Sequence, residues 1–148
     1  MWRGDLTNAE WVRLEPHLPA TGRRGGRWND HRRVINGILF WVRTGIPWRN
    51  LSERFGSWKS VYERHRRWSA DGTWDRILRA VQADADLAGR KGGRPAGFDS
   101  EIYKRRNEVE RTIKRLKNSR AIATRYDKRA YVFHGTVTAA TIRLWLRP

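Results

Sequence analysis

Apolar residues recur along this sequence at the i, i+3, i+4 and i+7 spacing of α-helices, and helix-capping and helix-ending residues separate the repeats. The first helix is predicted to begin at Thr7, which forms a capping-box pattern with Glu10, and to end at the prolines that follow. The second is predicted to begin at Asn29 or Asp30 and to end at Gly45. Its apolar face is wide, so we expect it to be the central helix of the core.

Three further helices are predicted between residues 47 and 86. A short one begins at Pro47 and ends at Gly56, and a basic one capped by Ser57 continues to about Ala70. The last is capped by Thr73. No stretch alternates apolar and polar residues convincingly as a strand does. The sequence therefore predicts an all-α fold whose N-terminal domain, residues 1–86, has about five helices.

The remaining residues are predicted to form a hinge and a C-terminal pair of helices. Residues 87–98 read LAGRKGGRPAGF, a basic, glycine-rich hinge. Within the C-terminal region, 99–148, a long helix is predicted from residue 99 to about 117, followed by a looser stretch at 118–128. The closing helix carries an apolar stripe formed by Phe133, Val137, Ala140 and Leu144.

The charge of the chain changes this picture by indicating a polyanionic partner. The formal net charge is +17 and the pI about 11.5. Residues 1–86 carry 16 Lys and Arg against 10 Asp and Glu, and residues 87–148 carry 16 against 5, so the excess is larger at the C-terminal end. A net charge of roughly 2–8 is enough for the solubility of a small domain. The excess therefore favours nucleic acid, because neutralising phosphates releases condensed counterions.

Other compositional features exclude several classes of protein. The sequence has no cysteine, which excludes disulfides and thiolate metal sites, and its four histidines show no zinc-binding spacing. The residues after Met1 lack the apolar core of a signal peptide. The longest uncharged run, Ala130 to Ile142, is too short and polar to span a bilayer. We therefore expect a cytoplasmic, nucleoid-associated protein with no membrane partner.

The helix that follows Ser57 is the first candidate DNA-binding element. It is predicted to place Lys59, Arg64, Arg66 and Arg67 on its outer side, behind a glycine-containing turn. Two helices joined by such a turn, the second of them basic, are typical of a helix-turn-helix. The alternative is a pair of packed helices whose charges are only solvated.

Two flexible basic segments are further candidates. The loop at residues 21–27 contains Arg23, Arg24 and Arg27, and it is either a solvated connector or an arm that contacts a DNA backbone or groove. Within the hinge, Gly93-Arg94-Pro95 is similar to the minor-groove arms of some DNA-binding proteins, so Arg94 is included among the predicted DNA contacts.

The predicted helix after residue 99 carries the candidate chemistry. At about 100° per residue, Tyr103, Arg106, Glu110 and Lys117 fall within about 60° of one another. Glu110 can bind a divalent metal, and the other three side chains can hold phosphates beside it. The alternative is a solvated face on which Arg106 and Glu110 form an i,i+4 ion pair.

The spacing Tyr-x2-Arg-x3-Glu-x6-Lys resembles a motif of the insertion-sequence DDE transposases of the IS4/IS5 group. The flanking segments GGRPAGFDSEIYKRRNEVERTIKRLK and AIATRYDKRA are similar to the same family. The N-terminal region, from LTNAEWVRLEPHLP to SADGTWDRIL, resembles the family's helical DNA-binding domain. The resemblance implies that Glu110 is the third catalytic carboxylate, that Arg106 and Lys117 attend DNA, and that the intact family uses Mg²⁺.

The sequence departs from this family in the middle. DDE chemistry needs three carboxylates around two metal ions, and in the family a ribonuclease-H-like sheet holds them. The two Asp and the strands would lie where this chain has only residues 87–98, which are too few for such a sheet. The nearest acids, Asp84 and Asp86, are predicted to end a helix. The chain is therefore interpreted as an internally deleted transposase, in which Glu110 binds metal only if two Asp come from elsewhere.

The sequence thus predicts a protein that binds duplex DNA at transposon ends, without a cofactor and without catalysis on its own. Two alternatives stay open. The chain is a subunit of an active DDE transposase that another chain completes, or it is a trans-acting regulator of a full-length transposase. The protein partner would be a second copy of this chain, forming a homodimer, or a full-length transposase. Whether any enzymatic activity remains is left open.

Overall fold

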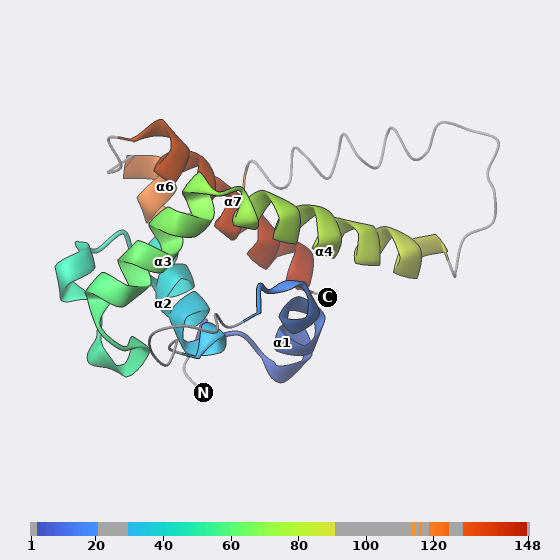
Figure 1. Cartoon of the computed structure of the whole chain (residues 1–148), viewed down its shortest axis with the longest axis horizontal. Coiled ribbons are helices and arrows are strands. Elements are labelled where there is room, and N and C mark those ends of the chain that lie inside the picture. The colour runs from blue at the N-terminus through green and yellow to red at the C-terminus, as the bar shows by residue number, and fades with distance from the viewer. Residues whose placement is uncertain are drawn as a thin grey trace.

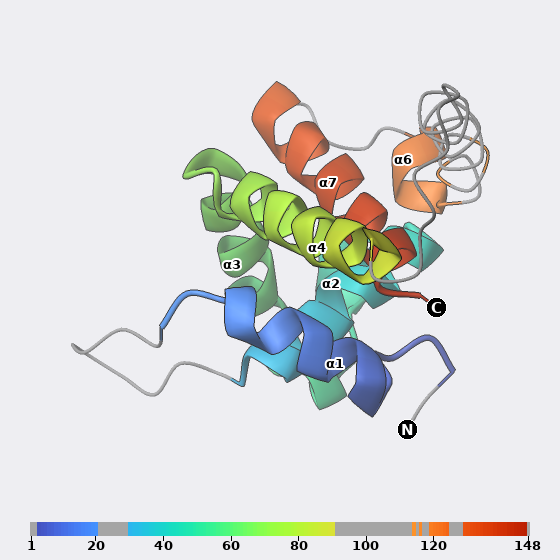
Figure 2. The same ribbon diagram turned by 90° about the vertical axis from the view of Figure 1, so that its right-hand side faces the viewer.

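The computed structural model describes residues 3–20, 30–90, 114, 116, 119–124 and 129–147. These residues form helices and short 3-10 turns and contain no strand, which confirms the predicted all-α fold. Figures 1 and 2 show α4 and α7 side by side, and α7 also packs against α1, α2, α3 and α6. The elements are α1 (Asn8–Leu14), η1 (Glu15–His17), α2 (His31–Thr44), η2 (Trp48–Asn50), η3 (Glu53–Phe55), α3 (Trp58–Ala70), α4 (Thr73–Arg90), α6 (Arg120–Thr124) and α7 (Ala130–Leu146).

The ends of α1 and α2 follow from the predicted capping residues. The Thr7 hydroxyl accepts the Glu10 amide, and the Glu10 carboxylate accepts the Thr7 amide at 2.8 Å, which completes the capping box. The Asp30 side chain caps α2, and Gly45 ends it in the left-handed conformation at φ 64°. Helix α2 buries a wide apolar face, as expected of the central core helix.

The predicted helix at residues 47–56 is wrong in form, because the segment consists of the two 3-10 turns η2 and η3. The backbone is extended at Leu51 and Ser52, where a continuous helix would require helical angles. The Ser52 hydroxyl accepts the Arg54 amide and so favours a new turn over the continued helix. This course of the chain buries both Leu51 and Phe55 in the core.

Helices α3 and α4 are joined by a two-residue turn at Asp71 and Gly72. Gly72 has φ 77°, which favours glycine. The Asp71 carboxylate accepts both the amide and the hydroxyl of Thr73, so Asp71 supplies the capping oxygen predicted for Thr73. Helix α4 continues through Arg90, so the first residues of the predicted hinge are helical.

Helix α7 buries a different side from the predicted stripe. Phe133, Val137 and Leu144 are only partly buried, although Ala140 belongs to the core. The buried side is rotated from the predicted stripe by roughly 120° and is formed mainly by Val132, Gly135, Thr136, Ala139, Ile142 and Leu146. Apolar and small residues occupy nearly every side of α7, so its periodicity did not determine which side packs.

Close approach to α3 explains which side of α7 is buried. A Cβ added at Gly135 would overlap the Ser69 side chain and come within 3.1 Å of the Ser69 Cα. Helix α7 packs along both α3 and α4, and its Ala139, Ile142 and Leu146 belong to the same core as α2. Part of the predicted C-terminal region, 99–148, thus shares the core of the N-terminal helices, while the predicted domain boundaries stay a prediction.

Two other expectations concern the segment before α7. The looser stretch predicted at 118–128 contains the short helix α6, which packs against α2 and α7. Nearly all of the predicted helix at 99–117 lies outside the described residues. Among the residues that the structure does describe, no helix is long and apolar enough to cross a membrane.

A fully buried histidine joins α3, α4 and α7 in the core. The Trp74 indole N–H donates to His65 Nδ1 at 3.2 Å, so the ring proton is on Nε2, which donates to the Thr136 hydroxyl at 3.0 Å. Thr136 in turn donates to the Val132 carbonyl. Burial lowers the pKa of His65 to about 3, so the imidazole is neutral and both of its nitrogens are paired.

The contact between Gly135 and Ser69 predicts a cost for the smallest added side chain. Gly135→Ala should lower the free energy of unfolding by roughly 1–3 kcal/mol, because the new methyl group forces α3 and α7 apart. Chemical denaturation monitored by circular dichroism measures this change. Adding Ser69→Gly should make the alanine less costly than it is in the wild-type background; an equal cost in both backgrounds would contradict the close approach.

The buried His65 predicts acid sensitivity. Because its pKa in the folded chain is about 3, compared with 6.5 for an exposed histidine, the unfolded chain binds a proton that the folded chain excludes. Stability should therefore be complete above about pH 6.5 and fall by about 1.4 kcal/mol per pH unit as the pH decreases toward 3. His65→Gln should be less stable at neutral pH but lose this component of the slope. Parallel pH dependences of the two proteins would exclude His65 as its source.

Candidate nucleic-acid interface

Helix α3 presents four charged side chains on the side that faces away from the core. Its buried side packs against α2 and α7. At about 100° per residue, Lys59, Glu63, Arg66 and Arg67 fall within an arc of about 100° on the other side. Glu63 is the one acid in the α3 sequence, so this arc carries a net positive charge.

The N-terminus of α3 combines an open helix end with two cations and an aromatic ring. Ser57 is the N-cap residue, yet its side chain makes no capping hydrogen bond, which leaves the first amides of α3 without a side-chain acceptor. The Arg49 guanidinium lies 6.0 Å from the centre of the Trp58 ring, and Lys59 Nζ lies 5.8 Å from it. Arg49 and Lys59 are both exposed. The helical pattern of the sequence does not point to Arg49, because Arg49 precedes α3 by nine residues.

Arg66 takes part in a surface cluster that bridges α3 and α7. It donates to Glu63 at 3.2 Å, and hydrogen bonds to Glu63 and Tyr131 raise its pKa. Tyr131 also accepts from Arg129 at 3.2 Å, and this bond lowers the pKa of Tyr131. Arg66 is thus partly engaged within the protein. Arg67 is exposed on the same side of α3.

Arg64 is not on the outer side of α3 as predicted. Its guanidinium contacts His31 Nδ1 at 2.8 Å and lies 5.5 Å from the centre of the Trp68 ring. His31 Nε2 lies 3.1 Å from the Pro19 carbonyl, so the imidazole donates to Pro19 and accepts from Arg64. Burial, and after it the charge of Arg64, lowers the pKa of His31. Arg64 therefore links α3 to the start of α2. It can do so because position 64 lies on the flank of α3, beside Trp68.

The helix-turn-helix prediction is modified by these contacts. The element before α3 is the single turn η3, which ends at Gly56 with φ 93°. Arg33 of α2 donates to the carbonyls of Glu53 and Arg54 and so holds η3 against α2. Helix α3 thus occupies the position of the second helix of a helix-turn-helix. The element in the position of the first helix is only the 3-10 turn η3.

The remaining predicted site residues lie outside the described part of the chain. They are Arg23, Arg24, Arg27, Arg94, Tyr103, Arg106, Glu110 and Lys117. Within the described ranges no group of three or more histidine or acidic side chains is arranged to hold a metal ion. Asp84 is exposed on α4 and lies 2.6 Å from His17 Nε2. Both Asp84 and Asp86 are helical, as predicted.

Comparison with known proteins places this helical region in a family. Residues 6–78 match the family model described as "Putative transposase of IS4/5 family (DUF4096)". The N-terminal region is thus similar to a transposase family of the IS4/5 group, which confirms the resemblance seen in that region, while the motif at Tyr103 to Lys117 lies beyond the match. The match covers α1 to the start of α4. It includes the α3 surface, formed by Lys59, Glu63, Arg66 and Arg67.

Two curated relatives are similar over part of the chain. It is 34% identical over 84 residues to the uncharacterized protein y4sN of Sinorhizobium fredii, which covers 55% of this chain and 66% of that protein. It is 33% identical over 97 residues to the "Insertion element IS402 uncharacterized 16.2 kDa protein" of Burkholderia cepacia, which covers 61% of this chain and 66% of that protein. The chain thus spans just under two thirds of each relative. No solved structure matches it.

Proposed function

We propose that this chain binds duplex DNA, at the ends of an insertion sequence, through the exposed side and N-terminus of α3. The observation that carries the proposal is the N-terminus of α3, whose first amides lack a side-chain cap and are flanked by the exposed cations Arg49 and Lys59. Helix N-termini bind phosphate through their amides and the positive end of the helix dipole. The IS4/5 family match supplies the biological context.

The α3 surface fits a DNA backbone contact in its charge and spacing. Lys59 and Arg67 are both exposed and are eight residues apart, which is about 12 Å along a helix. Contacts of this kind to phosphates fix the position of a protein on the duplex, and side chains near the helix N-terminus then reach base edges in the major groove. Glu63 lies between the two cations and limits the attraction.

We further propose that the chain does not cut or join DNA by itself. Phosphoryl transfer with two metal ions needs bridging carboxylates that hold the ions about 3.5–4 Å apart. The sequence supplies Glu110 without the two aspartates and the sheet of the intact family. Arg106 and Lys117, four residues before and seven after Glu110, outnumber its single negative charge, and a site of net positive charge repels Mg²⁺.

DNA binding is tested with a fluorescein-labelled duplex of mixed sequence, titrated at several salt concentrations and followed by fluorescence anisotropy. Lys59→Ala and Arg67→Ala should each weaken binding and reduce the slope of log K against log salt by about one unit per lost phosphate contact. Glu63→Gln should tighten binding, because it removes the negative charge between the two cations.

Arg79→Ala is the matched control for this titration. Arg79 is an exposed cation on α4, so its loss changes the net charge equally without changing the α3 surface. Arg64→Ala is a second control, expected to lower thermal stability because Arg64 contacts His31. If Arg79→Ala reduces the salt slope as much as Lys59→Ala does, the binding is non-specific and α3 is not the interface.

The absence of catalysis is tested on a supercoiled plasmid that carries candidate transposon ends, with Mg²⁺ or Mn²⁺. We expect no nicking, and Glu110→Gln should bind DNA equally or slightly more tightly, because only a repulsive charge is lost. Nicking that disappears in Glu110→Gln would contradict this proposal. Nicking that needs an added full-length relative would instead indicate a subunit completed in trans.

A further inference from the structure

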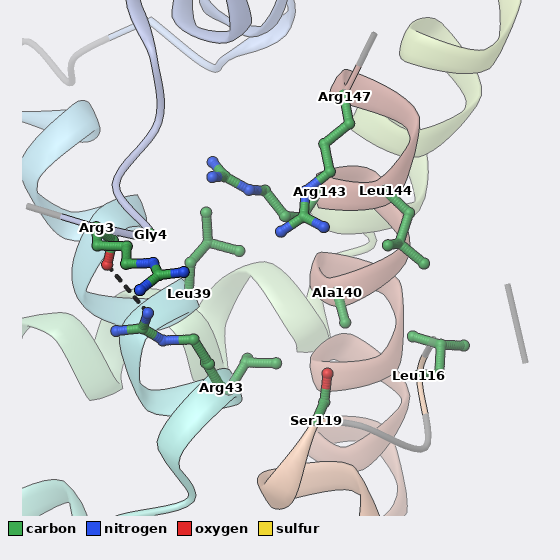
Figure 3. Close-up of a pocket in the computed structure, with 11 residues that line it drawn as sticks. Arg3, Gly4, Leu39, Arg43, Leu116, Ser119, Ala140, Arg143, Leu144 and Arg147 are labelled. Atoms are coloured by element: carbon green, nitrogen blue, oxygen red, sulfur yellow. Dashed lines mark hydrogen bonds between the residues drawn. The ribbon is translucent and has the colours of Figure 1, made fainter. Parts of the chain in front are cut away.

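A second concentration of positive charge lies between α2, α7 and the segment before α1. It is a pocket of about 580 Å³, and none of its lining residues belongs to α3. Figure 3 shows Arg3, Arg43, Arg143 and Arg147 around the space between these elements. The other lining residues include Leu39, Val42, Ala140 and Leu144, which give the pocket an apolar wall.

The charge of this pocket is largely uncompensated. None of the described residues that line it is acidic. Glu10, outside the lining, has its carboxylate 3.2 Å from Arg143 Nη1. Within the described ranges, Arg3, Arg43 and Arg147 have no carboxylate at ion-pair distance. Asp5, whose charge also acts on Arg143, is paired with Arg54, so the four guanidinium groups keep a net positive charge around a space open to solvent.

The protein holds part of this arrangement in place by its own contacts. Arg143 is half-buried, and it donates to the Asp5 carbonyl at 3.2 Å as well as contacting Glu10. Arg43 donates to the Arg3 carbonyl at 3.0 Å, so the Arg3 backbone is fixed beside α2. Burial lowers the pKa of Arg143, the charges of Glu10 and Asp5 oppose this effect, and the charges of Arg147 and Arg43 lower the pKa further. Bringing these cations together costs free energy that a bound anion would recover.

We propose that this pocket binds the phosphate monoester of a nucleotide. Guanidinium groups form paired hydrogen bonds with phosphate oxygens, and a doubly charged monoester suits three uncompensated arginines. The volume is within the range of small-ligand pockets, roughly 300–1,000 Å³, and exceeds what one phosphate fills. The wall formed by Leu39, Val42, Ala140 and Leu144 can cover the sugar and base. The ligand is either a free nucleotide or the phosphorylated end of a DNA strand.

Isothermal titration of the full chain tests the proposal and distinguishes the two sources. The probes are dAMP against deoxyadenosine, and a 5′-phosphorylated thymidine hexanucleotide against the same strand with a 5′-hydroxyl. We expect binding of at least one phosphorylated probe, weakened about tenfold or more when the phosphate is absent. The probe that binds more tightly identifies the source. Equal binding with and without the phosphate, or no binding, would overturn the proposal.

Paired variants separate this pocket from the α3 interface. Arg3→Gln with Arg147→Gln removes two lining charges whose side chains make no hydrogen bond described here, and it should weaken the phosphorylated probe about tenfold or more. Arg76→Gln with Arg79→Gln, on α4, removes the same charge and should change binding by less than about threefold. Equal losses in both pairs would mean general attraction and not a pocket.

The same titrations distinguish binding at this pocket from the proposed DNA binding at α3. Lys59→Ala with Arg67→Ala should weaken the duplex while leaving the phosphorylated probe bound, because neither residue lines the pocket. Failure of duplex binding would therefore leave this inference standing. Loss of the probe in the α3 variant would contradict a separate site.

Discussion

The neutral imidazole of His65 is the constraint on which the packing of this chain depends. A buried imidazole is tolerated only when both nitrogens are paired, and here the donor comes from Trp74 of α4 and the acceptor from Thr136 of α7. The three helices must therefore keep one relative rotation and distance. The small residue at Gly135 allows the distance, since a larger side chain would overlap Ser69.

This packing also determines which cations of α3 are available to a ligand. With Val61, His65 and Trp68 directed into the core, Lys59 and Arg67 are left on the outside. Arg64 lies between these two sides and contacts His31 at the start of α2. The same basic helix thus supplies a structural contact on its flank and an exposed cationic side. A DNA interface placed there rests on a rigid core, so its charges are held at fixed spacing.

The packing of α7 is the main tertiary feature of the C-terminal region. The sequence predicted this helix as part of a C-terminal pair that follows a hinge. Helix α7 instead packs along α3 and α4, and through Ala139, Ile142 and Leu146 it completes the core that α2 begins. The pocket of arginines depends on this packing, because Arg143 of α7 and Arg147, the C-cap residue of α7, line it together with Arg3 and Arg43.

The sequence alone determined the features that depend on neighbours within a few residues. The Thr7–Glu10 capping box, the Asp30 cap, the Gly45 stop and the family motifs of residues 6–78 are all local. Tertiary structure decided the rest. The rotation of α7, the contact of Arg64 with His31, and the placing of Arg3 and Arg147 around one pocket each depend on side chains far apart in the sequence. Helical periodicity shows that a helix has an apolar side, but where apolar residues surround the helix, as in α7, only close packing against Ser69 selects the side that is buried.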